Sequence, residues 1–135
     1  MISLRWHNSL DYLMAFFLIL APWIFNWFGI TPAKWVFVGV GTLLLFSSLG
    51  TNYYRSLKRK IPIGIHMAID TLSGLYLLSA PYLYSYRELL SKVQYNIHLI
   101  FGLLLLVLVA LTHPKIEAAK SPSERAEINH DPLPR

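Results

Sequence analysis

The sequence predicts an all-α membrane protein in which four transmembrane helices form two tandem helical hairpins. Three observations lead to this prediction. The chain of 135 residues is 55% hydrophobic and only 14% charged, whereas soluble domains carry about a quarter charged residues. Its apolar residues are concentrated in four segments. Finally, a motif of the first segment returns in the third.

The four apolar segments each have the length of a membrane span. They run over residues 9–28, 33–51, 65–84 and 93–112. A helix of about 20 residues crosses a hydrocarbon layer of about 30 Å. Strands are not expected, because the apolar runs are continuous rather than alternating and a barrel would need many more segments. We therefore expect four spans and no sizeable soluble domain.

A pattern of His, Asp four residues later, and then Pro with an aromatic residue occurs twice at a constant offset. The matched residues are His7 and His66, Asp11 and Asp70, Pro22 and Pro81, and Trp23 and Tyr82. Repetition of four residue types in one register indicates an internal duplication. The first repeat covers residues 1–60 and the second covers 61–113, which leaves a polar tail over 114–135.

Basic residues predict the orientation of the chain. Arg55, Lys58, Arg59 and Lys60 lie in the short connection between the second and third segments. Lys and Arg in short loops favour the cytoplasm, so this loop and both termini are expected to be cytoplasmic. The same four cations are candidates for binding anionic lipid headgroups. The net charge of +5 is therefore read as a sign of membrane topology, not as a sign of nucleic-acid binding.

The two His–Asp pairs are the candidate polar or ion site. Residues four apart lie on one face of a helix, so His7 lies beside Asp11, and His66 beside Asp70. Two interpretations stay open. Each pair is an intrahelical contact that satisfies its Asp, or the two pairs meet in one cavity that relays protons or binds a divalent metal.

A haem is the least favoured use of the histidines. His98 lies near the outer end of its segment, whereas His7 and His66 lie near the inner ends of theirs. These depths differ by more than 10 Å at roughly 1.5 Å per helical residue, so only His7 and His66 could share an iron. We assign no cofactor and no metal from the sequence.

The Pro–aromatic pairs are interpreted as structural. Pro22 and Pro81 should kink their helices near the outer ends, because proline lacks an amide hydrogen and clashes with the preceding turn. Trp23 and Tyr82 should anchor those ends at the membrane interface. Aromatic residues that follow them are expected in the same interfacial belts: Trp27, Tyr84 and Tyr86.

The composition and motifs favour a non-enzymatic role. Cysteine is absent, which excludes disulfides, thiolate metal sites and cysteine nucleophiles. The sequence contains no evident nucleophile–base pair, phosphate loop or nucleotide motif. We expect a lipid-embedded scaffold or accessory subunit that self-associates or joins a larger membrane complex. The alternative is a proton- or ion-coupled carrier or channel that uses the His–Asp pairs.

These motifs resemble those of the SPW-repeat family of small bacterial membrane proteins. Its unit is two transmembrane helices with Ser-Pro-Trp in the first. Here the motif reads Ala21-Pro22-Trp23 and Ala80-Pro81-Tyr82, and His66-x-x-x-Asp70-x-x-x-Gly74 also matches the family in the second copy. The resemblance covers residues 5–113. It implies the architecture and supplies no catalytic residue.

Overall fold

The computed structural model describes residues 2–27, 29–51 and 61–112. The basic connection with Arg55, Lys58, Arg59 and Lys60, and the tail over residues 114–135, lie outside the described residues. The predictions made for those two segments therefore remain predictions.

The described chain is all-helical, as predicted. The helices are α1 (Leu4–Ile24), α2 (Thr31–Gly50), α3 (Ile63–Leu83) and α4 (Lys92–Leu111), with a single 3₁₀ turn, η1 (Arg87–Leu89), before α4. Among them, α2, α3 and α4 are long and apolar enough to cross a membrane. α1 has a similar length of 21 residues, but polar side chains interrupt its first turns.

The first helix begins and ends earlier than predicted. The sequence suggested residues 9–28, whereas α1 runs from Leu4 to Ile24. His7 therefore lies inside α1, although the predicted span began at residue 9. The early end has a local cause: Asn26 adopts φ 55°, a left-handed conformation that Asn tolerates better than most residues and that stops a helix.

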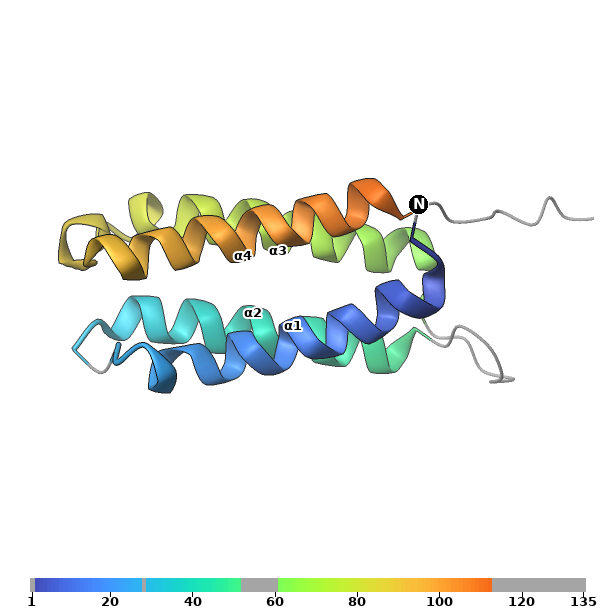
Figure 1. Cartoon of the computed structure of the whole chain (residues 1–135), viewed down its shortest axis with the longest axis horizontal. Helices are drawn as coiled ribbons and strands as arrows, with labels where there is room; N and C mark the ends of the chain where they lie inside the picture. The colour runs from blue at the N-terminus through green and yellow to red at the C-terminus, as the bar shows by residue number, and fades with distance from the viewer. Residues whose placement is uncertain (1, 28, 52–60, 113–135) are drawn as a thin grey trace, which may run out of the picture.

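The helices pack as two hairpins, α1 with α2 and α3 with α4 (Figure 1). Glycines bring the helices of each hairpin close together. A Cβ on Gly41 would lie 2.9 Å from the carbonyl oxygen of Ala15. In the second hairpin, a Cβ on Gly74 would lie 3.0 Å from the carbonyl oxygen of Gly102. Small residues allow this close approach, as is common between membrane helices.

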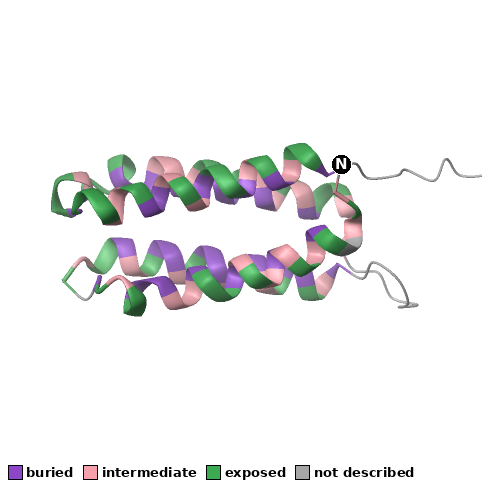
Figure 2. Cartoon of the chain, in the orientation of Figure 1, coloured by how far each residue is buried: buried purple, intermediate pink, exposed green. Residues whose placement is uncertain are grey.

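Many residues on the outer sides of the helices are exposed (Figure 2), and large apolar side chains are among them. Phe46 and Leu72 are each 66% exposed, and Leu103 is 52% exposed. A soluble protein rarely presents so many large apolar side chains to water. The surface therefore suits a hydrocarbon environment.

Candidate functional site

Four ionisable side chains of α1 and α3 lie at one end of the bundle. His7 and Asp11 lie in the first two turns of α1, and His66 and Asp70 in the first two turns of α3. Both helices start at this end, so equivalent positions on them lie at the same depth. We call these four residues the His–Asp cluster.

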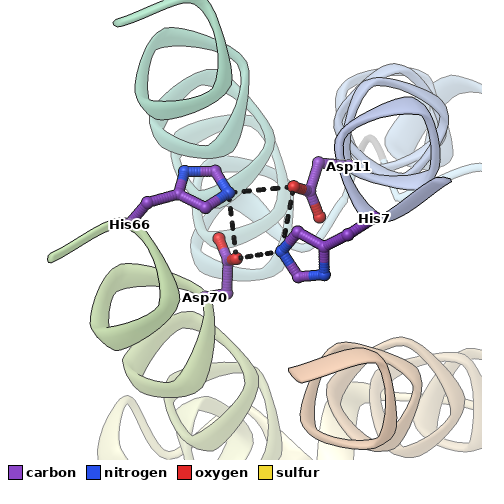
Figure 3. Close-up of side chains that lie close together, drawn as sticks. All are labelled: His7, Asp11, His66 and Asp70. Atoms are coloured by element: carbon purple, nitrogen blue, oxygen red, sulfur yellow. Dashed lines mark hydrogen bonds and ion pairs between the residues drawn. The ribbon is translucent and has the colours of Figure 1, made fainter. Parts of the chain in front are cut away.

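The His–Asp cluster is a closed ring of contacts (Figure 3). Across the two hairpins, His66 Nε2 lies 2.9 Å from Asp11 Oδ2, and His7 Nε2 lies 3.2 Å from Asp70 Oδ2. Within each helix, the His Nε2 lies 3.3 Å from the Asp Oδ2 four residues later. Nitrogen and oxygen atoms thus alternate around the ring, and the four atoms lie within 4.8 Å of one another.

Both interpretations of the paired motifs therefore hold geometrically. Each Asp contacts the His of its own helix, and each also contacts the His of the other hairpin at a shorter distance. All four side chains are fully buried, with 0% exposure. Asp11 and Asp70 consequently face the bundle interior and not the lipid or headgroup boundary.

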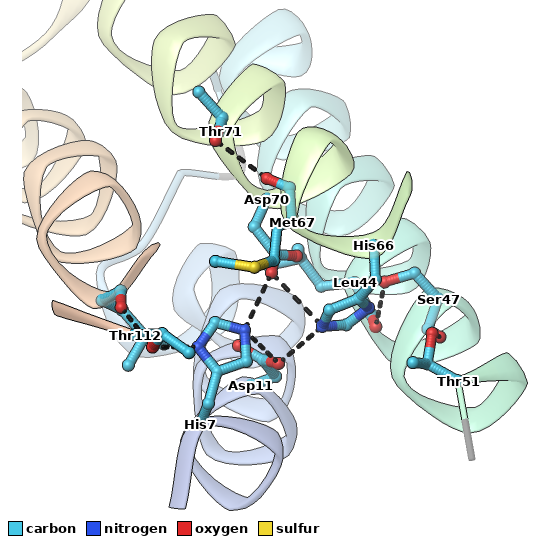
Figure 4. A network of polar contacts seen from close by, with 11 residues as sticks. His7, Asp11, Leu44, Ser47, Thr51, His66, Met67, Asp70, Thr71 and Thr112 are labelled. Carbon is cyan, nitrogen blue, oxygen red and sulfur yellow. Dashed lines mark hydrogen bonds and ion pairs between the residues drawn. The ribbon is translucent and has the colours of Figure 1, made fainter. Parts of the chain in front are cut away.

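A hydrogen-bond chain fixes the orientation of the His7 ring (Figure 4). Thr112 Oγ1 donates to the Leu108 carbonyl oxygen at 2.7 Å. Its only hydrogen is used there, so the same oxygen accepts from His7 Nδ1–H, at 2.9 Å. The backbone of Ser47 on α2 bonds His66 in turn. Each imidazole is thus bonded by a residue outside its own helix: His7 by Thr112 at the end of α4, and His66 by Ser47 of α2.

A second buried cluster lies at the opposite end of the bundle, around His98 of α4. The His98 Nδ1–H donates to the Leu77 carbonyl oxygen at 3.3 Å. Trp27 stacks on the His98 ring with centroids 5.6 Å apart, and Phe37 and Tyr86 approach the same ring at 4.6 and 5.6 Å. His98 is therefore far from the His–Asp cluster along the bundle, as expected, and it bonds a neighbouring helix.

Trp27 and Tyr86 were predicted to lie in interfacial belts, and this was wrong. Their side chains are 0% and 1% exposed. The reason is the turn that ends each first helix of a hairpin. The amide of Trp27 donates to the Pro22 carbonyl at 2.9 Å, and the amide of Tyr86 donates to the Pro81 carbonyl at 3.0 Å. This six-residue closure is a Schellman motif, which turns the following side chain back onto the helix.

The predicted anchors do lie outside the core. Trp23 is 49% exposed and Tyr82 is 59% exposed, which suits side chains at a membrane interface. The Nζ atom of Lys34 lies 5.8 Å from the centre of the Trp23 ring. Pro22 and Pro81 lie within the last turn of their helices, and the kinks predicted there remain predictions.

The repeated Pro–aromatic and His–Asp motifs, one copy on each hairpin, are the features by which the family is recognised. Residues 5–113 match the SPW repeat domain. The chain belongs to the SPW repeat family. No curated protein and no solved structure matches the chain. Together with the three apolar helices, membership of the SPW repeat family indicates a small membrane protein.

Within this SPW repeat protein, the family motif has a defined structural place. Its Pro lies in the last turn of the first helix of each hairpin, and its aromatic residue is about half exposed. Trp27 or Tyr86, a few residues later, is buried in the core. Trp27 and Tyr86 occupy equivalent positions in the two repeats, and this was the sequence signal that could have identified them as core residues. The polar cluster lies at the other end, so the motif does not contribute to it.

Proposed function

We propose that this SPW repeat protein is a small, non-enzymatic integral membrane protein that binds a cation in its interior, at the His–Asp cluster. One observation carries the proposal. Asp11 and Asp70 are both fully buried, and the Oδ2 atom of each lies within 3.3 Å of two histidine nitrogens. Two carboxylates so close together in a protein interior need positive charge between or beside them.

The position of the cluster supports a role for the bound cation in holding the protein together. Each hairpin supplies one His and one Asp. Cation binding and docking of the two hairpins are therefore linked: a cation that binds only the docked state stabilises that state. At a concentration 100 times its dissociation constant, the gain is about 2.7 kcal/mol.

The proposal is tested by replacing one carboxylate. In the full chain in mild detergent, Asp70→Asn should abolish the rise in unfolding temperature that protons or divalent cations give the wild type, because one of two anionic ligands is gone. Ser73→Ala is the matched control, since Ser73 is a buried polar residue on the same helix outside the cluster. A wild-type stability that is independent of every cation tested would refute the proposal.

If the bound cation also moves across the membrane, the protein is the ion-coupled carrier or channel that the sequence offered as an alternative. The same variant separates binding from movement when the protein is placed in liposomes. If the wild type carries cations across the bilayer, Asp70→Asn should remove that flux. Binding without flux would assign the cluster to a bound, non-transported cation.

A scaffold or accessory role is the second candidate, and a groove supports it. An apolar groove of about 500 Å³ runs between α2 and α3, lined in part by Gly39, Leu72 and Tyr76. It lies at the seam of the two hairpins and would accept a helix of another membrane subunit or of a second copy. Gly39→Phe fills the groove, so it should reduce any oligomer or co-purifying complex seen by native mass spectrometry.

We also propose that both termini lie in the cytoplasm of a bacterial inner membrane. The pairing of Ile2 with Thr112 supports this, because it brings both ends of the described bundle to one side. The cysteine-free chain permits a direct test. With an impermeant maleimide on intact cells, Glu88→Cys should be labelled and Ser3→Cys should not. The opposite pattern would invert the topology.

A further inference from the structure

The four atoms of the His–Asp cluster are spaced like the ligands of one metal ion. A tetrahedral ion with bonds of about 2.0–2.1 Å separates neighbouring ligands by roughly 3.3 Å. The four His–Asp separations are 3.3, 3.2, 2.9 and 3.3 Å. No two of the ligand atoms are more than 4.8 Å apart, so the four atoms surround one common centre.

The orientation of His7 matches that of a metal ligand. Its Nδ1–H is used by Thr112, so the Nε2 of the neutral ring presents a lone pair to Asp11 and Asp70. A lone pair aimed at two carboxylate oxygens is repulsive unless a cation lies between them. Metal-bound histidines typically donate their other ring N–H to a fixed acceptor in this way. The backbone of Ser47 bonds His66 from the side of α2.

A central ion explains the ring better than hydrogen bonds alone. A proton on Nε2 lies along one N–H···O line, yet each Nε2 has two carboxylate oxygens within 3.3 Å. A single ion would contact all four atoms at once. Moreover, Asp11 Oδ1 and Asp70 Oδ1 are buried without a hydrogen-bond partner among the described residues, so each carboxylate directs its second oxygen, Oδ2, into the ring.

Ligand chemistry selects the class of ion. Two imidazole nitrogens with two carboxylate oxygens suit zinc and neighbouring divalent transition metals. Calcium and magnesium favour six or more oxygen ligands, which this ring does not supply. Two neutral histidines, two carboxylates and one divalent ion also sum to zero charge, which lowers the cost of burial.

We infer that His7, Asp11, His66 and Asp70 bind one divalent transition-metal ion of the zinc class, with one His and one Asp from each hairpin. This inference rests on the proposed cation-binding function and names its ligand. The metal would join the two repeats directly. Sequence spacing alone assigned no metal here, because spacing cannot show that the two pairs meet.

The test uses Co²⁺ as a spectroscopic probe for the zinc class. Full-length protein in mild detergent is stripped with a chelator and titrated with Co²⁺, then with Zn²⁺. We expect one Co²⁺ per chain, the strong visible absorption of low-symmetry tetrahedral cobalt, and loss of that absorption when Zn²⁺ displaces it. Asp11→Asn should weaken Co²⁺ binding at least tenfold, and Ser73→Ala should leave it unchanged.

The outcomes separate this inference from the proposed function. If the wild type binds no Co²⁺ or Zn²⁺ but takes up protons that Asp11→Asn abolishes, the metal is overturned and cation binding stands. If the wild type binds neither metal nor protons at the cluster, both are overturned. Because the decisive titration uses the wild type, it does not depend on whether a variant folds.

Discussion

Thr112 determines which nitrogen of His7 faces the His–Asp cluster. Its hydroxyl is committed to the Leu108 carbonyl as donor, so it can only accept from His7. The residue that caps the C-terminus of α4 thus sets the tautomer of a residue on α1. Thr112 is therefore a positioning residue. It bonds Nδ1 of His7 and does not contact the Nε2 and Oδ2 atoms that form the ring.

We expect Thr112→Val to weaken metal binding by about 10–100-fold, the usual effect of losing such a supporting hydrogen bond. The isosteric Val keeps the packing but offers His7 Nδ1–H no acceptor. Thr71→Val is the control, because the Thr71 hydroxyl donates to the Met67 carbonyl and lies outside the cluster. The measurement is the Co²⁺ titration of both variants. Equal affinities would show that Thr112 does not position His7.

Tyr86 carries a buried hydroxyl at the other end of the bundle. Its oxygen has no hydrogen-bond partner among the described residues. Burial raises the pKa of the Tyr86 phenol above its ordinary value. The folded state therefore holds the phenolic proton more tightly than the unfolded state does. The resulting stability is present in full below about pH 10 and is lost as the pH rises above that value.

Tyr86→Phe should therefore leave stability at neutral pH unchanged or slightly improved, because it removes a buried group without a partner. At the same time it should flatten the loss of stability above about pH 10. Unfolding temperatures of wild type and variant, compared from neutral to alkaline pH, test both statements. Tyr12→Phe controls for the loss of a tyrosine elsewhere. A variant with the wild-type alkaline profile would contradict the assignment.

At the scale of helices, one glycine sets the closeness of α1 and α2. A Cβ on Gly41 would lie 2.9 Å from both the Ala15 carbonyl oxygen and the Ile19 amide nitrogen. Both are backbone atoms and cannot rotate away. The helices would have to separate, and the first turns of α1, which carry half of the His–Asp cluster, would move with them.

Gly41→Ala should consequently destabilise the protein by about 1–3 kcal/mol, as overpacking commonly does. Gly39→Ala is the matched control two residues earlier on α2, where a Cβ would meet nothing within 4 Å. There the higher helix propensity of Ala should stabilise by up to about 1 kcal/mol. Unfolding of both variants in detergent, followed by circular dichroism, gives the comparison. Destabilisation of similar size at both positions would argue against close packing at Gly41.

The ends of α1 and α3 show why helix boundaries were harder to predict than helices. Asn26 and Ser85 adopt φ 55° and 53°, and each stops its helix in the same way. Asn is a common residue in this conformation, whereas Ser is not. The first predicted span included Trp27 because it was based on the length of the apolar segment. Residue type alone cannot show whether an aromatic side chain lies at the end of a span or folds back into the core.

At the scale of the molecule, the apolar segments and their repetition were enough to predict the all-α class, and the resemblance of the repeated motifs to a known family predicted the family. They also identified the four cluster residues, through the spacing of His and Asp on one helical face. Their convergence was not predictable. It depends on how α1 and α3 rotate about their axes and on contacts with Thr112 and Ser47, which lie far away in the sequence.

The pairing of Ile2 with Thr112 has a consequence for how the two repeats are ordered along the chain. The Ile2 amide donates to the Leu111 carbonyl oxygen at 3.0 Å, so the start of the first hairpin adjoins the end of the second. A short linker from residue 112 to residue 2, with a new opening between Thr51 and Ile61, would yield a circular permutant. In it α3 and α4 would precede α1 and α2. We expect this permutant to form the same bundle, because the two ends that the linker joins are already adjacent.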